Sequence, residues 1–177
     1  SFSFWFKGDH PIQGSSPSSR YLLAATNRYN SPHSSQLTIF LNHTTNKFTV
    51  SIGTSAHKTY VYEVPPKYTE WAFYTITWKG TSDDQPEVYY DNNIQMALDS
   101  VSTTGGGNFG TLPVQGAIQL LGFGTSTTGC EGSMANLAIW KKELSLSERK
   151  TLYEQDGDPL RVDEMFSVLI DYWKLGS

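Results

Sequence analysis

Two short stretches of the sequence combine an aromatic ring with amide and charged side chains, which is the chemistry of many sugar-binding sites. A pyranose ring offers an apolar C–H face that packs on an aromatic ring and a polar rim that pairs with amides and carboxylates. The two stretches are Asn27, Arg28, Tyr29 and Asn30, and Tyr90, Asp91 and Asn92. Both are candidate ligand-binding sites. The alternative for each is a turn without a ligand, since Asp and Asn favour turns.

The acidic residues offer weaker candidates. Asp83 and Asp84 lie together in an expected loop, as candidates for calcium or for sugar hydroxyls, with a solvated turn as the favoured alternative. Residues 154–158 (EQDGD) superficially resemble the E-x-D-x-x-E signature of laminarinase-like glycanases. Retaining glycoside hydrolysis needs two carboxylates about 5 Å apart. Gly157 and Pro159 break any strand here, so we expect a helix end with solvated acids and no enzyme.

Histidine and cysteine add no recognisable metal or catalytic site. The four histidines, His10, His33, His43 and His57, are scattered, whereas a metal site needs ligands that converge. The single cysteine, Cys130, excludes an internal disulfide and a paired-cysteine metal knuckle. The sequence contains no G-x-S-x-G nucleophile elbow. We therefore expect no catalytic residues and no cofactor.

Composition narrows the class of protein. The chain has 177 residues, with 13 Lys and Arg against 17 Asp and Glu, and its net charge is -4. This mild acidity gives no basic footprint for nucleic acid. No apolar run approaches the roughly 18 residues of a membrane span, so we expect no membrane insertion. The N-terminus has no initiator Met and no signal-peptide layout, so we expect a processed product or a piece of a larger protein.

The elements that must position these residues are mainly strands. Apolar and polar residues alternate with a period of two, and the runs are rich in aromatic and β-branched residues. The clearest runs are residues 2–7, 37–42, 48–52, 60–62 and 71–76. The five tryptophans fall in expected strands and are assigned mostly to the core; they are Trp5, Trp71, Trp78, Trp140 and Trp173.

Turns and one helix complete the expected architecture. Residues 42–47 and 91–93 are polar and lie between strands, which predicts two hairpins. Either Ser145 or Ser147 can cap a short helix, and Ser145 with Glu148 forms a capping-box pattern; Gly157 and Pro159 lie at the end of the helix. Its expected apolar stripe is Leu144, Leu146, Leu152 and Tyr153. A final strand covers 167–175. With eleven or twelve strands and one helix near the C-terminus, the sequence predicts an all-β, antiparallel jelly-roll sandwich over a single domain, 1–177.

Five blocks in order resemble the concanavalin A-like lectin and glucanase superfamily, especially its laminin G-like and pentraxin-like domains. The blocks are residues 2–8 (FSFWFKG), 71–78 (WAFYTITW), 88–93 (VYYDNN), 118–122 (IQLLG) and 132–154 (GSMANLAIWKKELSLSERKTLYE). The family usually opens with a further strand that is missing before Phe2. The final strand, 167–175, is therefore expected to fill that place and close the sheet.

The resemblance to this superfamily does not imply a bound metal. Pentraxin-like domains place acidic and amide calcium ligands after the block that 118–122 resembles, and calcium needs six to eight oxygen ligands. Residues 122–128 (GFGTSTT) contain no acid, so the pentraxin-type calcium ligands are absent. We expect no metal, and if calcium binds, Asp83 and Asp84 are its candidate ligands.

These observations predict a non-catalytic recognition module. Carbohydrate binding through shallow loops and the concave sheet is favoured, with a glycan or glycoprotein as partner. The alternative is a protein-interaction or structural surface domain of a larger adhesin, receptor or viral protein, and a glycan hydrolase is disfavoured. The sequon Asn42-His43-Thr44 is compatible with an extracellular or surface-exposed location, which we expect for this module.

Overall fold

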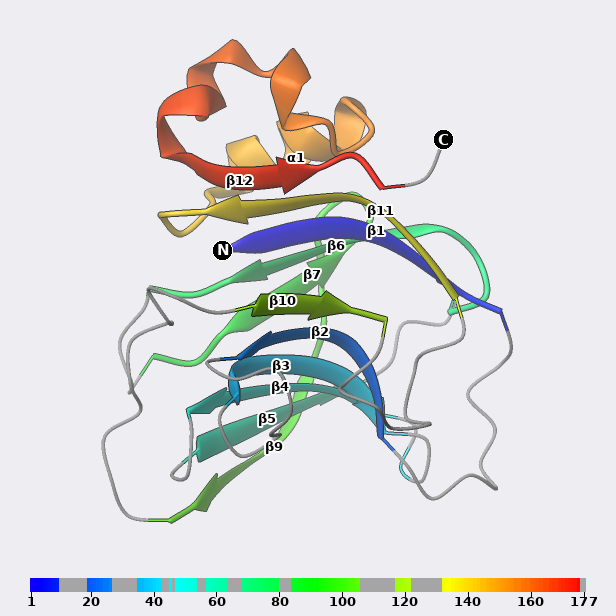
Figure 1. Cartoon of the computed structure of the whole chain (residues 1–177), viewed down its shortest axis with the longest axis vertical. Helices are drawn as coiled ribbons and strands as arrows, with labels where there is room; N and C mark the ends of the chain where they lie inside the picture. Colours follow the sequence, from blue (N-terminus) through cyan, green and yellow to red (C-terminus); the bar gives the residue numbers. More distant parts are fainter. Residues whose placement is uncertain are drawn as a thin grey trace. The chain divides into compact units, whose positions relative to one another are not determined.

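A computed structural model of the chain describes ten stretches of residues (Figure 1). They are 1–9, 19–26, 35–42, 45, 47–53, 57–63, 68–79, 84–105, 117–121 and 132–175. The chain divides into two compact units. The first contains Ser1–Asp9, Pro65–Met96 and Gly132–Ser177, and the second contains His10–Val64 and Ala97–Glu131. Each unit is assembled from discontinuous segments and holds one β-sheet.

The sheet of the first unit has six strands in the order β12-β11-β1-β6-β7-β8, and neighbouring strands are antiparallel. Its strands are β1 (Phe2–Gly8), β6 (Ala72–Thr77), β7 (Glu87–Tyr90), β8 (Ile94–Gln95), β11 (Gly132–Trp140) and β12 (Leu169–Trp173). The expected final strand therefore exists and pairs with β11, but Ser167 and Val168 belong to a preceding 3-10 helix.

The sheet of the second unit also has six antiparallel strands, in the order β10-β2-β3-β4-β5-β9. Its strands are β2 (Ser19–Thr26), β3 (Ser35–Asn42), β4 (Lys47–Gly53), β5 (His57–Glu63), β9 (Leu98–Thr104) and β10 (Ala117–Leu120). The predicted hairpin at 42–47 joins β3 to β4, with Asn42 opposite Lys47. The two sheets confirm the prediction of an all-β, antiparallel protein.

One face of the second sheet is apolar and buried. It carries alternate residues of three central strands, all at most 3% exposed: Leu37, Ile39, Leu41, Phe48, Val50, Ile52, Tyr60 and Tyr62. The intervening residues point to the opposite face because successive side chains of a strand alternate. The period-two pattern thus fixes which residues of this sheet face the core.

The first sheet is buried on both faces around β6, whose six residues are all buried. Phe4 and Tyr74 stack on one face, with ring centroids 5.6 Å apart. On the other face, Phe73 and Trp140 pack in a cluster with the segment that follows β11. That segment contains α1 (Leu146–Glu154) and the 3-10 helices η2 (Pro159–Arg161) and η3 (Asp163–Val168). Among the described residues, no helix is long and apolar enough to cross a membrane.

The predicted capping box begins α1. Ser145 Oγ accepts from the Glu148 backbone N–H, and the Glu148 carboxylate accepts from the Ser145 N–H at 2.8 Å. Leu144 and Leu152 are buried as expected, but Leu146 is 50% exposed, so this part of the predicted apolar stripe is wrong. Leu146 and Leu152 are six residues apart, which is a net rotation of about 240° around the helix axis. Leu146 therefore lies away from the helix face that buries Leu152.

One tryptophan also departs from the prediction. Trp140 is buried and its indole N–H donates to Ser3 Oγ at 3.0 Å. Trp71, by contrast, is 46% exposed. It directly precedes β6 and lies outside the ladder, so the packing that buries both faces of β6 does not extend to it.

Candidate functional site

The polar face of the second sheet carries the candidate site. In antiparallel strands, residues directly opposite each other lie on the same face. The register therefore aligns three rows of side chains across β3, β4, β5 and β9, on the face opposite the buried one. The rows are Asn42–Lys47–Glu63, Phe40–Thr49–Val61–Ser100 and Thr38–Ser51–Thr59–Ser102. Most of their side chains end in a hydroxyl, amide or charged group.

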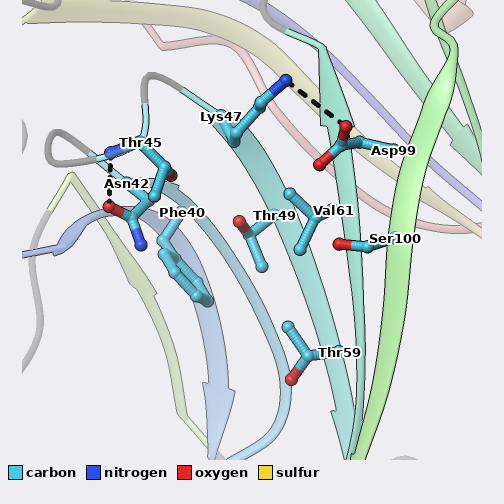
Figure 2. Close-up of a pocket in the computed structure, with 9 residues that line it drawn as sticks. All are labelled: Phe40, Asn42, Thr45, Lys47, Thr49, Thr59, Val61, Asp99 and Ser100. Carbon is cyan, nitrogen blue, oxygen red and sulfur yellow. Dashed lines mark hydrogen bonds and ion pairs between the residues drawn. The ribbon is translucent and has the colours of Figure 1, made fainter.

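A pocket of about 320 Å³ lies on this face (Figure 2). Nine residues from the four strands and the β3–β4 turn line it: Phe40, Asn42, Thr45, Lys47, Thr49, Thr59, Val61, Asp99 and Ser100. The volume lies within the range of small-molecule sites. Phe40 supplies an aromatic ring, and the threonines and Ser100 supply hydroxyls that both donate and accept hydrogen bonds.

A β-bulge brings Asp99 into the pocket. Val61 pairs with Ser100 and Tyr62 pairs with Leu98, so Asp99 is an additional residue in β9. A bulge of this kind redirects a side chain at the edge of a sheet. Asp99 and Ser100 consequently both line the pocket, although they are neighbours in sequence.

Lys47 is held at one end of the pocket by two carboxylates. Its ammonium forms an ion pair and hydrogen bond with Glu63, and lies 3.6 Å from Asp99 (Figure 2). The hydrogen bond to Glu63 raises the pKa of Lys47 above its usual value, and the charges of Asp99 and Glu63 act in the same direction. Lys47 therefore stays charged at neutral pH and balances the carboxylate of Asp99 in the pocket lining.

The remaining polar groups are held in place by short local contacts. Asn42 Oδ1 accepts from the Thr45 N–H at 3.2 Å, which fixes the amide at the turn between β3 and β4. Ser51 Oγ and Thr59 Oγ1 lie 3.3 Å apart, so adjacent hydroxyls on β4 and β5 interact. This arrangement can bind a small hydroxylated molecule by hydrogen bonds along one edge and by contact with Phe40.

The predicted site at Tyr90, Asp91 and Asn92 belongs to the first unit. Asp91 and Asn93 adopt φ values of 47° and 62°, which confirms the predicted hairpin turn between β7 and β8. Asp91 Oδ1 accepts from the Phe73 N–H at 3.2 Å, and the Asp91 N–H donates to Phe73 O at 2.7 Å. Asn92 is exposed. The carboxylate of Asp91 thus ties the turn to β6.

Tyr90 lies on the buried-core side of the first sheet. It pairs with Tyr74, which pairs with Phe4, so these three side chains share one face. Tyr90 is half-buried there. A turn and a core face of the first sheet therefore account for Asp91 and Tyr90.

Other predicted residues fall partly outside the described residues. Asn27, Arg28, Tyr29 and Asn30 lie outside them, as does Asp83. Asp84 is described, in a half-buried bend. Among the described residues, no group of three or more His, Cys, Asp or Glu side chains is placed to hold a metal ion.

The acidic segment 154–158 ends a helix, as predicted. Glu154 is the last residue of α1, and Asp156 follows with φ of 57°. Asp158 is buried, contrary to the prediction of solvated acids, because its carboxylate accepts from the Leu160 N–H at 3.0 Å and caps η2. The Asp158 carboxylate thus stabilises the chain reversal between α1 and η2.

Sequence reasoning missed the pocket because its residues are neither contiguous nor unusual in type. Thr49, Thr59 and Ser100 are ordinary strand residues on the face opposite the apolar one, and they meet only through the register of β4, β5 and β9. The useful signal was Phe40, an aromatic residue at an outward position between the core residues Ile39 and Leu41. An aromatic side chain on a polar face is the feature to follow in such a strand.

Comparison of the sequence with models of protein families finds no match, and comparison with curated proteins finds none either.

Proposed function

We propose that this chain is a non-catalytic recognition module that binds carbohydrate in the pocket on the polar face of β3, β4, β5 and β9. The observation that carries the proposal is the lining of that pocket. It combines one aromatic ring, several hydroxyls, an amide and a lysine–carboxylate pair within about 320 Å³. Sugar recognition uses this mixture of an apolar surface and paired donors and acceptors.

The charge of the lining favours a neutral sugar. Lys47 and Asp99 offset each other across 3.6 Å, and Glu63 adds a second carboxylate beside Lys47. A sulfate or carboxylate on the ligand would meet these two negative charges and compete with them for Lys47. A neutral hexose, in contrast, can donate to Asp99 and accept from Lys47 without breaking their ion pair. We therefore propose neutral hexose units as the ligand class, bound without a metal.

The finer fold assignment belongs to the same proposal. We propose that the two sheets form a jelly-roll sandwich of the concanavalin A-like type, with β12 as the strand that closes the first sheet. Three features support it: two six-stranded antiparallel sheets, a buried apolar face on each, and five ordered sequence blocks that resemble the superfamily. The sequon at Asn42 supports an extracellular or surface-exposed location.

A set of matched variants tests the site. Thr59→Val removes a pocket hydroxyl while keeping the shape of a β-branched residue, and we expect binding of a neutral oligosaccharide to weaken about fivefold, the value of one hydrogen bond. Phe40→Leu keeps apolar volume but removes the ring, with a similar expected loss. Titration calorimetry measures both. The control is Thr103→Val, the same change at an exposed position of β9 that lies outside the pocket lining.

The production of the protein matters to this test. Asn42 belongs to the sequon and also lines the pocket, so a glycan attached there would stand at the site itself. Protein made in bacteria leaves Asn42 unmodified and presents the pocket open. Equal affinity of the wild type, Thr59→Val and Phe40→Leu for every sugar that binds would contradict the proposed site.

A protein-interaction module is the second candidate function. Exposed apolar side chains on edge strands favour it, chiefly Ile170 on β12, which is 60% exposed, and Val101 on β9. A module of this kind would not bind free sugar, and its binding to a protein partner would be lost when these residues are made polar.

A further inference from the structure

β9 is an edge strand with unusual exposure. It ends the order of strands in the second sheet, and no described strand pairs with its outer side (Figure 1). All seven of its side chains are exposed. Every second residue of an edge strand points its N–H and C=O away from the sheet, so β9 offers a row of backbone donors and acceptors.

The rows of buried apolar side chains continue onto β9, and the last residue of each row is exposed. Ile39, Val50 and Tyr60 form one such row and are at most 3% exposed. Val101 continues that row and is 49% exposed. The next row ends in the same way, since Tyr62 is buried and its partner Leu98 is 36% exposed. The apolar rows thus continue onto β9, where their last residues are exposed.

β9 carries a bulge at Asp99, but residues 100–104 beyond it lack the residues that most often protect an edge strand. Such strands usually carry lysine or proline, or are very short. Residues 98–104 (LDSVSTT) contain neither, and their one charge, Asp99, is directed into the pocket and lies beside Lys47. The segment after the bulge, 100–104, has no charged side chain. Its chemistry suits another uncharged strand with exposed hydroxyl and β-branched side chains.

We propose that a second copy of this chain pairs with β9, antiparallel and centred on Val101. This register sets the two Val101 side chains opposite each other, which covers the exposed apolar row. It sets Ser100 opposite Ser102 of the partner subunit. It also sets Asp99 opposite Thr103 of the partner subunit, so that the two Asp99 carboxylates lie at opposite ends of the seam and no like charges meet.

The pairing joins the polar faces of the two copies. The row Phe40–Thr49–Val61–Ser100 continues into Ser102 of the partner subunit and then along the partner's own polar row. The two β5 strands lie three strand spacings apart, about 14 Å. The two pockets therefore open on one continuous face, and an extended glycan can reach both. This last consequence rests on the proposed function, whereas the pairing does not.

Cysteine cross-linking tests the pairing and its register. In a background of Cys130→Ser, Val101→Cys places two thiols directly opposite, within the distance a disulfide spans. Thr103→Cys is the matched control, because the two Thr103 positions lie about 14 Å apart along the strands in this register. Under mild oxidation, we expect a covalent dimer from Val101→Cys at least tenfold faster than from Thr103→Cys. Equal rates, or faster cross-linking of Thr103→Cys, would overturn the proposed register.

Sedimentation equilibrium tests the dimer without an added thiol. We expect the wild type to reach twice the monomer mass as its concentration rises to 100 µM, and Val101→Lys to remain monomeric because a charged side chain blocks strand addition. Ile170→Lys is the matched control, an exposed apolar residue on the edge strand β12 of the first sheet, and should still dimerise. A wild type that stays monomeric at 100 µM, or a Val101→Lys dimer, overturns the proposal.

Glycan binding separates the two proposals. A wild type that dimerises but binds no sugar would contradict the proposed function and leave the pairing intact. A monomeric wild type that binds sugar would contradict the pairing and leave the proposed function intact. Where both hold, binding to a surface coated with oligosaccharide should weaken at least tenfold in Val101→Lys, while its affinity for the free sugar in solution stays unchanged.

Discussion

Asn136 and Gly157 show how single residues hold the corner where the first sheet meets its helices. Asn136 adopts φ of 50° within β11, opposite a shift in the β1 register, and its amide donates to Asp156 O at 2.8 Å. The same amide accepts from the Tyr172 hydroxyl at 3.0 Å. Gly157 follows Asp156 with φ of 71°, directly against Trp5 and Phe73. One asparagine thus links β11, β12 and the end of α1.

Replacing Gly157 should destabilise this corner strongly. A Cβ there would lie 2.7 Å from the Phe73 ring and 2.9 Å from the Trp5 indole nitrogen, and φ of 71° adds a backbone penalty of about 1 kcal/mol or more. We expect Gly157→Ala to lower the free energy of unfolding by more than about 2 kcal/mol, measured by urea denaturation. Gly105→Ala is the control, because Gly105 is exposed and has φ of 76°. Equal losses in the two variants would show that packing at Gly157 contributes nothing.

The phenol of Tyr89 should ionise only at an unusually high pH. Burial raises the pKa of Tyr89 to about 12, and its hydrogen bond to Glu87 Oε2, at 2.6 Å, acts in the same direction. The guanidinium of Arg149 lies 3.8 Å above the ring and opposes this rise only partly. A raised pKa means that the folded state holds the phenol proton more tightly. The resulting stability is present below pH 10 and is lost as the pH rises toward 12.

Absorbance of the phenolate measures this directly. Burial also raises the pKa of Tyr172 to about 12, so the native protein should show a late phase that contains both residues. In Tyr89→Phe, the late phase should lose the amplitude of one tyrosine, and in urea all remaining tyrosines should titrate near pH 10. An unchanged late phase in Tyr89→Phe would contradict the account.

At the scale of elements, α1 depends on its first turn. The helix has nine residues, which is too short to be stable alone in water. It is held by the burial of Leu144 and Leu152 and by buried Arg149, which donates to Leu144 O and to Asn93 Oδ1 in the β7–β8 turn. The capping box provides partners for two backbone N–H groups at the N-terminus, those of Ser145 and Glu148.

Removal of the cap should therefore be measurable. We expect Ser145→Ala to reduce the free energy of unfolding by about 1 kcal/mol, the usual value of an N-cap. Ser147→Ala is the matched control in the first turn: it removes only the 3.1 Å contact between the Ser147 and Ser145 hydroxyls and leaves the cap, and alanine is the better helix former, so its loss should be smaller than that of Ser145→Ala. Chemical denaturation compares the two. A loss that is equal in both variants would show that the cap does not stabilise α1.

Local sequence patterns predicted the elements better than the site. The alternation of Ile39 and Phe40, the turn at Asp91 and the capping box at Ser145 each depend on residues close in sequence, so the strands, hairpins and helix could be predicted. The pocket depends on which strands are neighbours and on the bulge at Asp99, neither of which has a local signal. The exposure of Leu146 and Trp71 likewise follows from where the packed faces end.

At the scale of the whole molecule, the chain passes between the two units four times. Neither unit is a continuous segment, since the first contains three stretches and the second contains two. All five tryptophans belong to the first unit, whereas both units contribute strands to the circular dichroism signal. Because neither unit can unfold without releasing the ends of segments in the other, we expect one cooperative transition.

A core variant in the second unit tests this coupling. Val50→Ala should cost about 2 kcal/mol, because Val50 is fully buried in the second sheet. The midpoint of urea unfolding should fall by the same amount whether it is followed by tryptophan fluorescence, which reports on the first unit, or by circular dichroism. A fluorescence midpoint that stays at the wild-type value would show that the two units unfold independently.

We propose that the polar face of the second sheet binds neutral sugar without a metal. The most direct measurement is a glycan array of bacterially produced wild type and Phe40→Leu, run with calcium and again with a chelator. We predict binding of the wild type to neutral oligosaccharides in both conditions and a clear loss in Phe40→Leu. Binding that the chelator abolishes would contradict the metal-independent site. No binding in either condition would contradict carbohydrate recognition by this chain.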